Sequence, residues 1–233
     1  MNKMILDRVG QMEYQQLEAI RTLRTNIRFC GDDIKVVMIT SSIPDEGKST
    51  ITVNLARSMA EAGQSVLIID GDIRKSILIG YLDAHLEQGG VFYGLSHYLT
   101  GQKRLEEVLY NTNIGNMDII FAGPAVPNPT EILGNHYFEE LIKTARENYD
   151  MILIDVPPLG AVIDAAVIAP YTDGAILVIQ QKAVSRKMVK NVKKQLKNSG
   201  VRILGAVLNK VEKERQGYGY YKGYYKEYYR KES

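Results

Sequence analysis

Residues 41–50 contain the residue types that bind the phosphate chain of a nucleotide. The segment ends in Pro44, Asp45, Glu46, Gly47, Lys48, Ser49 and Thr50. Gly47 lets the backbone approach a phosphate, Lys48 can reach the β- and γ-phosphates, and the hydroxyl of Ser49 or Thr50 can ligate Mg²⁺. Ser49 occupies the usual hydroxyl position of this pattern. We therefore predict a P-loop that binds Mg·ATP through residues 45–50.

The match to the P-loop pattern is imperfect, since Ser42 stands where the first glycine is expected. A loop that contains Gly-Lys-Ser by chance is the alternative. An apolar run precedes the segment and a helical pattern follows it, which is the setting in which backbone N–H groups and a helix N-terminus surround a phosphate. This context favours the P-loop.

Carboxylates follow two further apolar runs. Asp70 and Asp72, at positions i and i+2 of an extended strand end, point to the same side, and Asp155 ends another run. Because the carboxyl ends of parallel strands line the ligand crevice of an α/β sheet, all three can face the phosphates. One of the first pair would lie near Mg²⁺ and the other near an attacking hydroxyl, and Asp155 would act on the metal through water. The alternative, three solvated strand ends, fits poorly beside a P-loop.

Two further polar residues are candidate nucleotide contacts. Arg74 follows the first pair of carboxylates and could help to neutralise phosphate, with simple surface charge as the alternative. Asn209 follows the last apolar run and could face the nucleotide base, although a strand-end Asn is more often a turn residue.

The C-terminal stretch is rich in tyrosine. Its candidate phosphoryl acceptors are Tyr218, Tyr220, Tyr221, Tyr224, Tyr225, Tyr228 and Tyr229. A tyrosine hydroxyl has an unperturbed pKa of about 10, so it needs a carboxylate base and a phosphate already neutralised by Lys48 and Mg²⁺. Beside a nucleotide site this stretch is typical of an acceptor. Taken alone, Tyr with Lys and Gly would equally suit an RNA-binding or membrane-surface segment.

The elements that must position these residues alternate along the chain. Short apolar runs predict buried strands at 36–39, 66–69, 119–121, 151–154, 175–179 and 203–208. Helical patterns lie at 48–62, 129–147, 161–169 and 185–198, with Gly63 and Gly200 as stop signals. This alternation predicts an α/β fold with a doubly wound, mostly parallel sheet. We expect an amphipathic helix at about 13–29, a domain over 1–209, and a flexible tail at 210–233.

The composition is that of one ordinary α/β domain. The 233 residues are 45% hydrophobic and 24% charged, and the net charge of +2 does not by itself call for a nucleic acid or an anionic membrane as partner. The single cysteine, Cys30, forms no internal disulfide, which fits a reducing cytosol. No apolar run approaches the roughly 20 residues that cross a bilayer, so membrane association is expected through a partner or a surface patch.

Together the motifs resemble those of the bacterial tyrosine kinases that control capsule and exopolysaccharide synthesis, in particular the separate cytoplasmic kinase subunit of Firmicutes. The resemblance rests on the P-loop, the Walker A′ run at 70–74, the Walker B run at 155–158, the segments 123–124 and 127–129, the N-terminal Glu18, Arg21 and Arg24, and the tyrosine-rich tail. The sequence departs from the family at Ser76, Val126 and Val156, which are loop-shape or packing positions, so we expect the chemistry to be intact.

The resemblance also places the chain among P-loop NTPases of the Min/Par-like class. It lacks the lysine that Min- and Par-type ATPases carry near the start of the P-loop, because residues 41–43 are Ser-Ser-Ile. This favours a kinase over a Min/Par-type switch ATPase without kinase activity, which is the first alternative. A non-catalytic scaffold that uses nucleotide for assembly is the second.

The resemblance implies an autophosphorylating protein-tyrosine kinase. It would transfer the γ-phosphate of ATP to tail tyrosines of a neighbouring subunit and so regulate polysaccharide synthesis and export. Lys48, Asp70 and Asp72 are the implied catalytic residues, with Asp70 as base. Ser49, Asp72 and Asp155 are the implied residues of the Mg²⁺ shell.

The resemblance implies partners as well. Spacings of three place Glu18, Arg21 and, nearly, Arg24 on one helix stripe, and these residues would form the subunit interface of a ring of unphosphorylated copies. Pairing within a solvated helix is the alternative. A membrane adaptor of polysaccharide chain-length control would activate this cytoplasmic protein and hold it at the inner face of the membrane. A cognate tyrosine phosphatase is a further implied partner, and no nucleic acid is expected.

Overall fold

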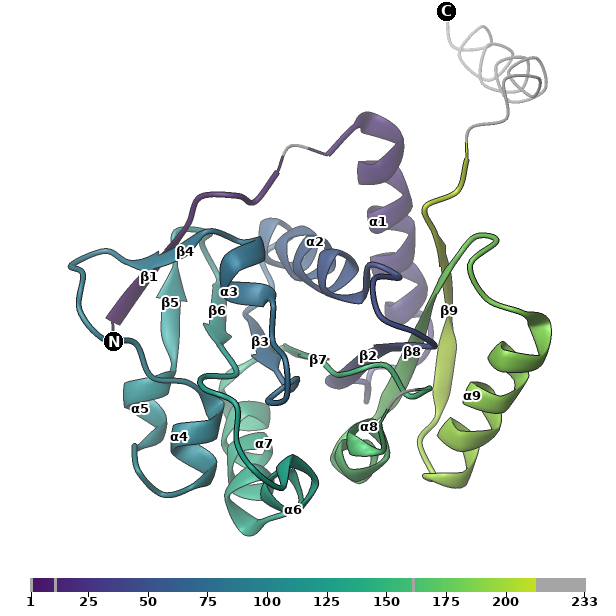
Figure 1. The fold of residues 1–233 in the computed structure, drawn as a ribbon. Helices are drawn as coiled ribbons and strands as arrows, with labels where there is room; N and C mark the ends of the chain where they lie inside the picture. The colour runs from purple at the N-terminus through teal and green to yellow at the C-terminus, as the bar shows by residue number, and fades with distance from the viewer. Residues whose placement is uncertain (1, 11, 161, 213–233) are drawn as a thin grey trace, which may run out of the picture.

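The computed structural model describes residues 2–10, 12–160 and 162–212, and the tyrosines of the expected acceptor tail lie outside this part. The described residues form a nine-stranded sheet in the order β4-β1-β5-β6-β3-β7-β2-β8-β9 (Figure 1). The strands are β1 (Asn2–Leu6), β2 (Val36–Ser41), β3 (Val66–Asp70), β4 (Ala84–Leu86), β5 (Tyr110–Thr112), β6 (Met117–Ile120), β7 (Met151–Asp155), β8 (Gly174–Gln180) and β9 (Ile203–Asn209).

The central and β9-side part of the sheet is parallel. The pairs β6·β3, β3·β7, β7·β2, β2·β8 and β8·β9 all run in parallel, whereas β5·β6 and β1·β4 are antiparallel. The predicted mostly parallel sheet is confirmed, and each apolar run forms a strand. The runs did not indicate β1, β4 and β5, because none of these strands has two consecutive buried residues.

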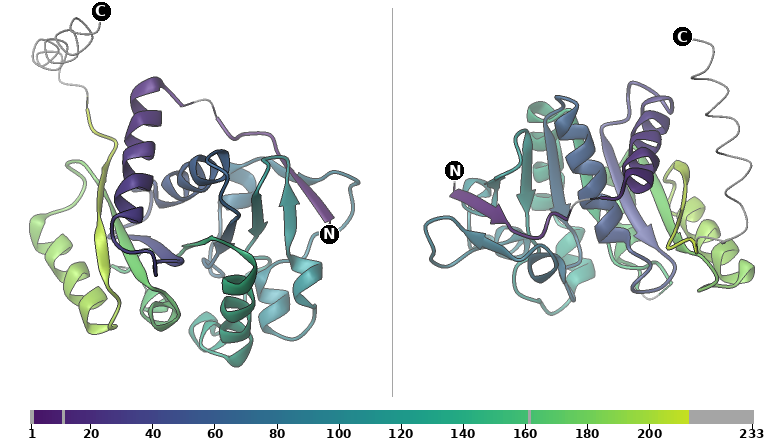
Figure 2. Two further views of the ribbon diagram at one scale, coloured as in Figure 1. Left: turned by 180° about the vertical axis from the view of Figure 1, so that it is seen from behind. Right: turned by 90° about the horizontal axis from the view of Figure 1, so that it is seen from above.

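Helices cover both faces of the sheet (Figures 1 and 2). One face packs against α1 (Tyr14–Arg28), α2 (Lys48–Glu61) and α3 (Leu78–Tyr81). The other packs against α4 (Leu95–Leu99), α5 (Leu105–Val108), α6 (Pro129–Leu133), α7 (His136–Asn148), α8 (Asp164–Ile168) with the 3₁₀ turn Ala169–Tyr171, and α9 (Arg186–Asn198). Each face buries its own apolar cluster, as a doubly wound fold requires.

The structure corrects two helix predictions. The helix expected at 129–147 is two helices, because the chain turns at Gly134 and Asn135, where the Asn135 side chain accepts a hydrogen bond from the N–H of Phe138 and so begins α7. The helix expected at 161–169 begins only at Asp164. The stop signals are confirmed: Gly63 and Gly200 have φ values of 90° and 78°, just after α2 and α9.

The parallel register gathers the candidate site residues at one edge of the sheet. Asp70 at the end of β3 is the register partner of Asp155 at the end of β7. The neighbouring strand β2 leads at the same edge into residues 42–47 and then α2. In the described part of the chain, no helix has the length and apolarity to cross a bilayer.

Candidate active site

The loop between β2 and α2 has the backbone conformation of a phosphate-binding turn. Gly47 caps α2 with a φ of 90°, a region where a Cβ is strained, and an added Cβ would lie 2.2 Å from Nδ2 of Asn209. Asp45 has a φ of 65°, which is also left-handed. The loop leads directly into the N-terminus of α2, where the first N–H groups and the helix dipole favour an anion.

Glu46 and Asn209 hold this loop from within the protein. The Glu46 carboxylate is fully buried and accepts hydrogen bonds from the N–H groups of Ser42 (2.6 Å), Ile43 (2.9 Å) and Gln180 (2.9 Å). Nδ2 of Asn209 donates to the carbonyl oxygen of Glu46 at 2.9 Å. The side chain of Glu46, expected at the nucleotide, therefore shapes the loop, and its backbone is the part that can meet a phosphate. Asn209 likewise contacts the loop itself.

Lys48 and Ser49 lie against the Walker B carboxylate. Ser49 Oγ donates to Oδ2 of Asp155 at 2.5 Å, and Lys48 Nζ lies 3.4 Å from both carboxylate oxygens of Asp155. The Lys48 Nζ is also 3.9 Å from Oδ2 of Asp72. The structure thus brings together four residues predicted from three separate segments.

Asp70 and Asp155 are buried carboxylates side by side. The pKa of Asp70 is raised to about 7, first by burial and then by the negative charge of Asp155, while the hydrogen bond from Ser76 and the charge of Lys48 oppose the shift. Burial also raises the pKa of Asp155, against the nearby Lys48 and Ser49. Two adjacent carboxylates in a low-dielectric setting cannot both ionise easily, so each raises the pKa of the other.

Asp70 and Asp72 differ in their surroundings. Asp70 is 1% exposed, whereas the Asp72 side chain is 13% exposed, and its Oδ1 accepts a hydrogen bond from the N–H of Lys75 at 3.1 Å. A carboxylate with a pKa near the operating pH suits a general base, and a more exposed carboxylate beside Lys48 suits the shell of a metal. The geometry is compatible with the expected division of roles.

Ser76 is a site residue that the sequence did not reveal. Its hydroxyl donates a short hydrogen bond to Oδ2 of Asp70. The sequence marked this position only as a departure from the family pattern in a loop. An Asp-x-Asp followed by a hydroxyl four residues later was the available signal, but a polar loop residue is too common to be interpreted without the fold.

Arg74 forms an ion pair with Asp164, a residue that was not among the predicted site residues. Its Nε donates to Oδ2 of Asp164 at 2.5 Å and its Nη2 to Oδ1 at 2.8 Å, while Thr130 Oγ1 lies 3.0 Å from the same Nη2. Asp164 is fully buried. In this arrangement the guanidinium ties the Walker A′ loop to α6 and α8, which is neither of the two roles considered for it.

The donor set fits Mg²⁺ bound together with phosphates. Within the described ranges no three His, Cys, Asp or Glu residues are grouped to hold a metal. Mg²⁺ is usually bound through one or two carboxylates, waters and substrate phosphates, so Ser49, Asp72 and Asp155 beside a P-loop form an appropriate partial shell. Thr50, the alternative hydroxyl, is half-buried at the first turn of α2.

The predicted interface residues lie on α1, as expected, but do not share one role. Arg21 Nη1 donates to Glu18 Oε1 at 2.7 Å on an exposed surface. Arg24 instead reaches across to α2, where its Nη1 donates to the carbonyl oxygen of Ser58. Glu18 and Arg21 are available at the surface, while Arg24 fixes α1 on α2.

The chain is similar to known proteins over most of its length. A family described as an AAA domain matches residues 34–204. Tyrosine-protein kinase CpsD of Streptococcus agalactiae is 40% identical over 204 residues, which are 88% of this chain and 87% of that protein.

Solved structures agree with the sequence matches. The kinase domain of Escherichia coli tyrosine kinase ETK gives a TM-score of 0.78 at 34% identity, over 88% of this chain and 80% of that one. The chimerical protein CapA2B2 gives 0.78 at 34% identity, over 84% and 85%. The septum site-determining protein MinD of Pyrococcus horikoshii, complexed with Mg-ADP, gives 0.63 at 30% identity, over 78% and 72%.

Proposed function

The chain belongs to the family of P-loop tyrosine-protein kinases, and on that premise we propose that it transfers the γ-phosphate of Mg·ATP to its own C-terminal tyrosines at 218–229. The observation that carries this proposal is the meeting of Lys48, Ser49 and Asp155 with Asp70, whose pKa is about 7, at one edge of the sheet. A site of this kind combines cations for phosphate with a base for a hydroxyl.

In the proposed step the phenol oxygen of the acceptor bonds to the γ-phosphorus while the bond from that phosphorus to the departing ADP oxygen breaks. The phenol proton passes to Asp70. A pKa of about 7 leaves a large fraction of Asp70 ionised at neutral pH and makes it a stronger base than an ordinary carboxylate. When bound, Mg²⁺ neutralises phosphate charge, and Ser49, Asp72 and Asp155 would hold it. Lys48 orients the phosphates.

We propose that this activity takes place between copies of the chain and depends on further partners. The acceptor tail is that of a neighbouring copy in a ring, and Glu18 and Arg21 on the exposed side of α1 contribute to the contact between copies. A membrane adaptor activates the kinase, a cognate phosphatase resets it, and the modification regulates capsular or exopolysaccharide synthesis and export. These parts are carried over from the family.

Intact-mass spectrometry after incubation with Mg·ATP tests the central claim. We expect a ladder of phosphate additions in the tail of the wild type, and none in Lys48→Met, because the γ-phosphate then loses its cation. Lys143→Met, an exposed lysine on α7, is the matched control and should behave as the wild type. Steady release of inorganic phosphate without any addition would instead identify a MinD-like switch ATPase.

The division of roles between the two Walker A′ aspartates has its own test. We expect Asp70→Asn to slow single-turnover transfer by roughly 100-fold or more, the usual loss on removing a general base, with ATP binding retained. Asp72→Asn should instead weaken the binding of Mg²⁺, so that a higher Mg²⁺ concentration is needed for half-maximal transfer. If Asp70→Asn were as fast as the wild type while Asp72→Asn abolished transfer, the two roles would be reversed.

A further inference from the structure

The near-neutral charge of the whole chain hides a strongly cationic segment. Between Asp173 and Glu212 there is no acidic residue. The basic residues in that interval are Lys182, Arg186, Lys187, Lys190, Lys193, Lys194, Lys197, Arg202 and Lys210. Most of them lie on α9, whose Val192 and Leu196 are buried against the sheet. The charge is therefore concentrated on one helix at one side of the fold.

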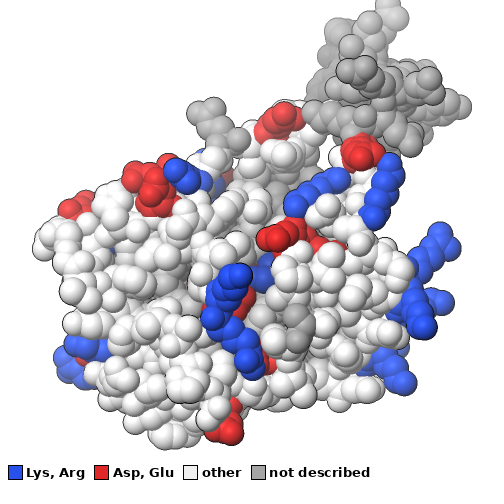
Figure 3. Space-filling model, viewed as in Figure 1, with Lys and Arg blue, Asp and Glu red and all other residues white. Residues whose placement is uncertain are grey.

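The outer side of α9 forms a surface that we call the cationic face, made of Arg186, Lys187, Lys190, Lys193, Lys194 and Lys197. All six side chains are exposed, and none takes part in an ion pair within the described part of the chain. Figure 3 shows Lys and Arg side chains along this edge of the molecule, over α9. Like charges at i and i+4, such as Lys190 and Lys194, destabilise a helix. Repulsion among the cations therefore destabilises α9, and binding of an anionic partner would reduce that repulsion.

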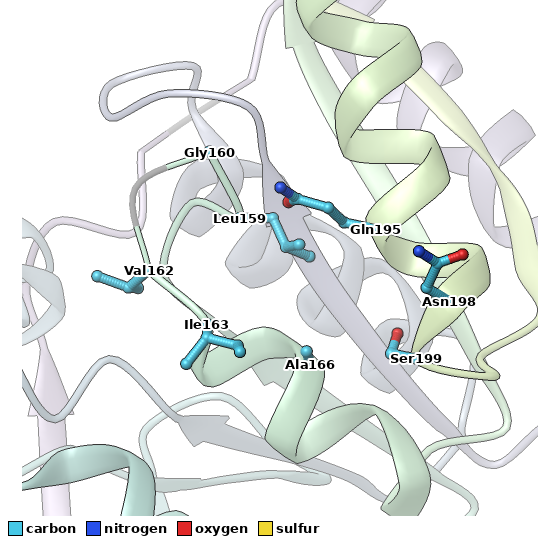
Figure 4. A pocket seen from close by; sticks show the side chains of 8 residues that line it. All are labelled: Leu159, Gly160, Val162, Ile163, Ala166, Gln195, Asn198 and Ser199. Atoms are coloured by element: carbon cyan, nitrogen blue, oxygen red, sulfur yellow. The ribbon is translucent and has the colours of Figure 1, made fainter.

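Apolar side chains flank the cationic face. Leu208 on β9, 58% exposed, lies with Val184 and Val189 at a hollow that Arg186 and Lys190 also line. On the other flank, an open groove of 540 Å³ separates α9 from α8, with Leu159 and Ile163 facing Gln195 and Asn198 (Figure 4). Of these two aliphatic residues, Ile163 is 63% exposed, whereas Leu159 is buried. Cations beside exposed aliphatic side chains are typical of a surface that lies on a lipid headgroup layer.

We propose that the cationic face binds the surface of an anionic phospholipid membrane. Five of its six cations are lysines, which act as point charges toward a diffuse anionic surface, whereas recognition of phosphate groups on nucleic acids favours the arginine fork. The face has no aromatic side chain on which a base could stack. The chain's own unmodified tail is basic in excess, with Lys213, Arg215, Lys222, Lys226, Arg230 and Lys231 against three Glu, so it would be repelled from the face.

This membrane contact does not depend on the proposed phosphoryl transfer, because none of the six residues belongs to the nucleotide site. It would orient the kinase with α9 toward the bilayer whether or not an adaptor is present. A basic residue near an anionic membrane strengthens binding by about fivefold, so three of them contribute roughly 100-fold.

Co-sedimentation of the full-length chain with vesicles tests the inference. We expect binding to phosphatidylcholine vesicles that contain about one third phosphatidylglycerol, little binding to pure phosphatidylcholine, and weakening with salt. The variant Lys190→Gln/Lys194→Gln/Lys197→Gln should bind roughly 100-fold more weakly. Gln has a helix propensity close to that of Lys, so α9 should persist, which circular dichroism and thermal melting check.

A second variant separates position from total charge. Arg8→Gln/Arg104→Gln/Lys143→Gln removes the same charge from exposed residues on other elements and should bind the vesicles as the wild type does. Equal loss in both variants would show a non-specific charge effect and overturn the proposal. So would undiminished binding by the α9 variant, absence of binding to the anionic vesicles, or binding of duplex DNA in preference to them.

Discussion

At the scale of single residues, burial raises the pKa values of the carboxylates in the site, and nearby donors and Lys48 oppose this effect. Asp70 and Asp155 are both withdrawn from water, and Lys48 lies within 3.4 Å of the second but only lowers the pKa of the first at longer range. The hydroxyl of Ser76 is the hydrogen-bond donor that most directly opposes the raised pKa of Asp70. Small changes around Asp70 should therefore move its protonation across neutral pH.

Replacing Ser76 should shift the pH dependence of transfer. Ser76→Ala removes a hydrogen bond that favours the charged carboxylate, so the pKa of Asp70 rises above about 7. A higher pKa leaves less of the base ionised. One hydrogen bond of about 1 kcal/mol lowers the acid constant about fivefold, and because the base starts about half ionised at pH 7, the rate there should fall about threefold and recover toward about pH 9. The pH profile of single-turnover phosphorylation measures this. Ser76→Thr keeps the hydroxyl and serves as control; superimposable acid limbs for Ser76→Ala and the wild type would contradict the assignment.

At the scale of elements, contacts between residues that are distant in the sequence fix the loops of the site. Glu46 ties the P-loop to the backbone of β8 at Gln180, and Asn209 at the end of β9 holds the carbonyl oxygen of Glu46. Arg74 ties the Walker A′ loop to Asp164 at the start of α8. These links set the shape of both loops before any ligand is bound, which lowers the cost of binding.

Breaking the link between Arg74 and Asp164 should loosen the Walker A′ loop. Asp164→Asn leaves the guanidinium without its buried anionic partner, and the unfolding free energy should fall by about 2 kcal/mol, as for hydrogen bonds to charged groups. Chemical denaturation measures the loss, with Thr130→Val as a milder control. If Asp164 kept Arg74 from binding phosphate, Asp164→Asn would bind ATP more tightly than the wild type. An unchanged or lower affinity for ATP would support the role of Arg74 in fixing the Walker A′ loop.

At the scale of the whole molecule, the fold separates its surfaces. The strand ends carry the site, α1 presents Glu18 and Arg21 on one face of the sheet, and α9 presents the cationic face on the other. Arg24 does not add to the exposed stripe of α1, because it is bonded to Ser58. Of the three residues predicted for an interface, Glu18 and Arg21 therefore lie at the surface, whereas Arg24 holds α1 on α2.

Reversing one charge on α1 tests the contact between copies. Arg21→Glu places two carboxylates at i and i+3 and removes a cation from the proposed ring interface, so the mass of the unphosphorylated protein in solution should fall toward that of the monomer. Light scattering after size-exclusion chromatography measures it. Arg57→Glu, which breaks a similar pair with Glu61 on α2, is the control. An unchanged mass for Arg21→Glu would remove α1 from the interface.

The sequence by itself determined the central strands, the main helical segments and the class of site. Continuous apolar runs predict the central parallel strands, and Gly47-Lys48-Ser49 between such a run and a helix predicts the P-loop, because these signals are local and depend on backbone geometry and hydrophobic burial. It also placed Asp70, Asp72 and Asp155 at strand ends, and the parallel topology then requires them to meet.

Only the tertiary structure decided what each polar side chain touches. The inward carboxylate of Glu46, the hydroxyl of Ser76 on Asp70, and the pairing of Arg74 with Asp164, 90 positions away, all depend on register and packing between distant segments. The pKa of Asp70 likewise follows from burial and from Asp155 on the neighbouring strand. A residue's type states what it can bind, but its partner and its dielectric surroundings exist only once the sheet has formed.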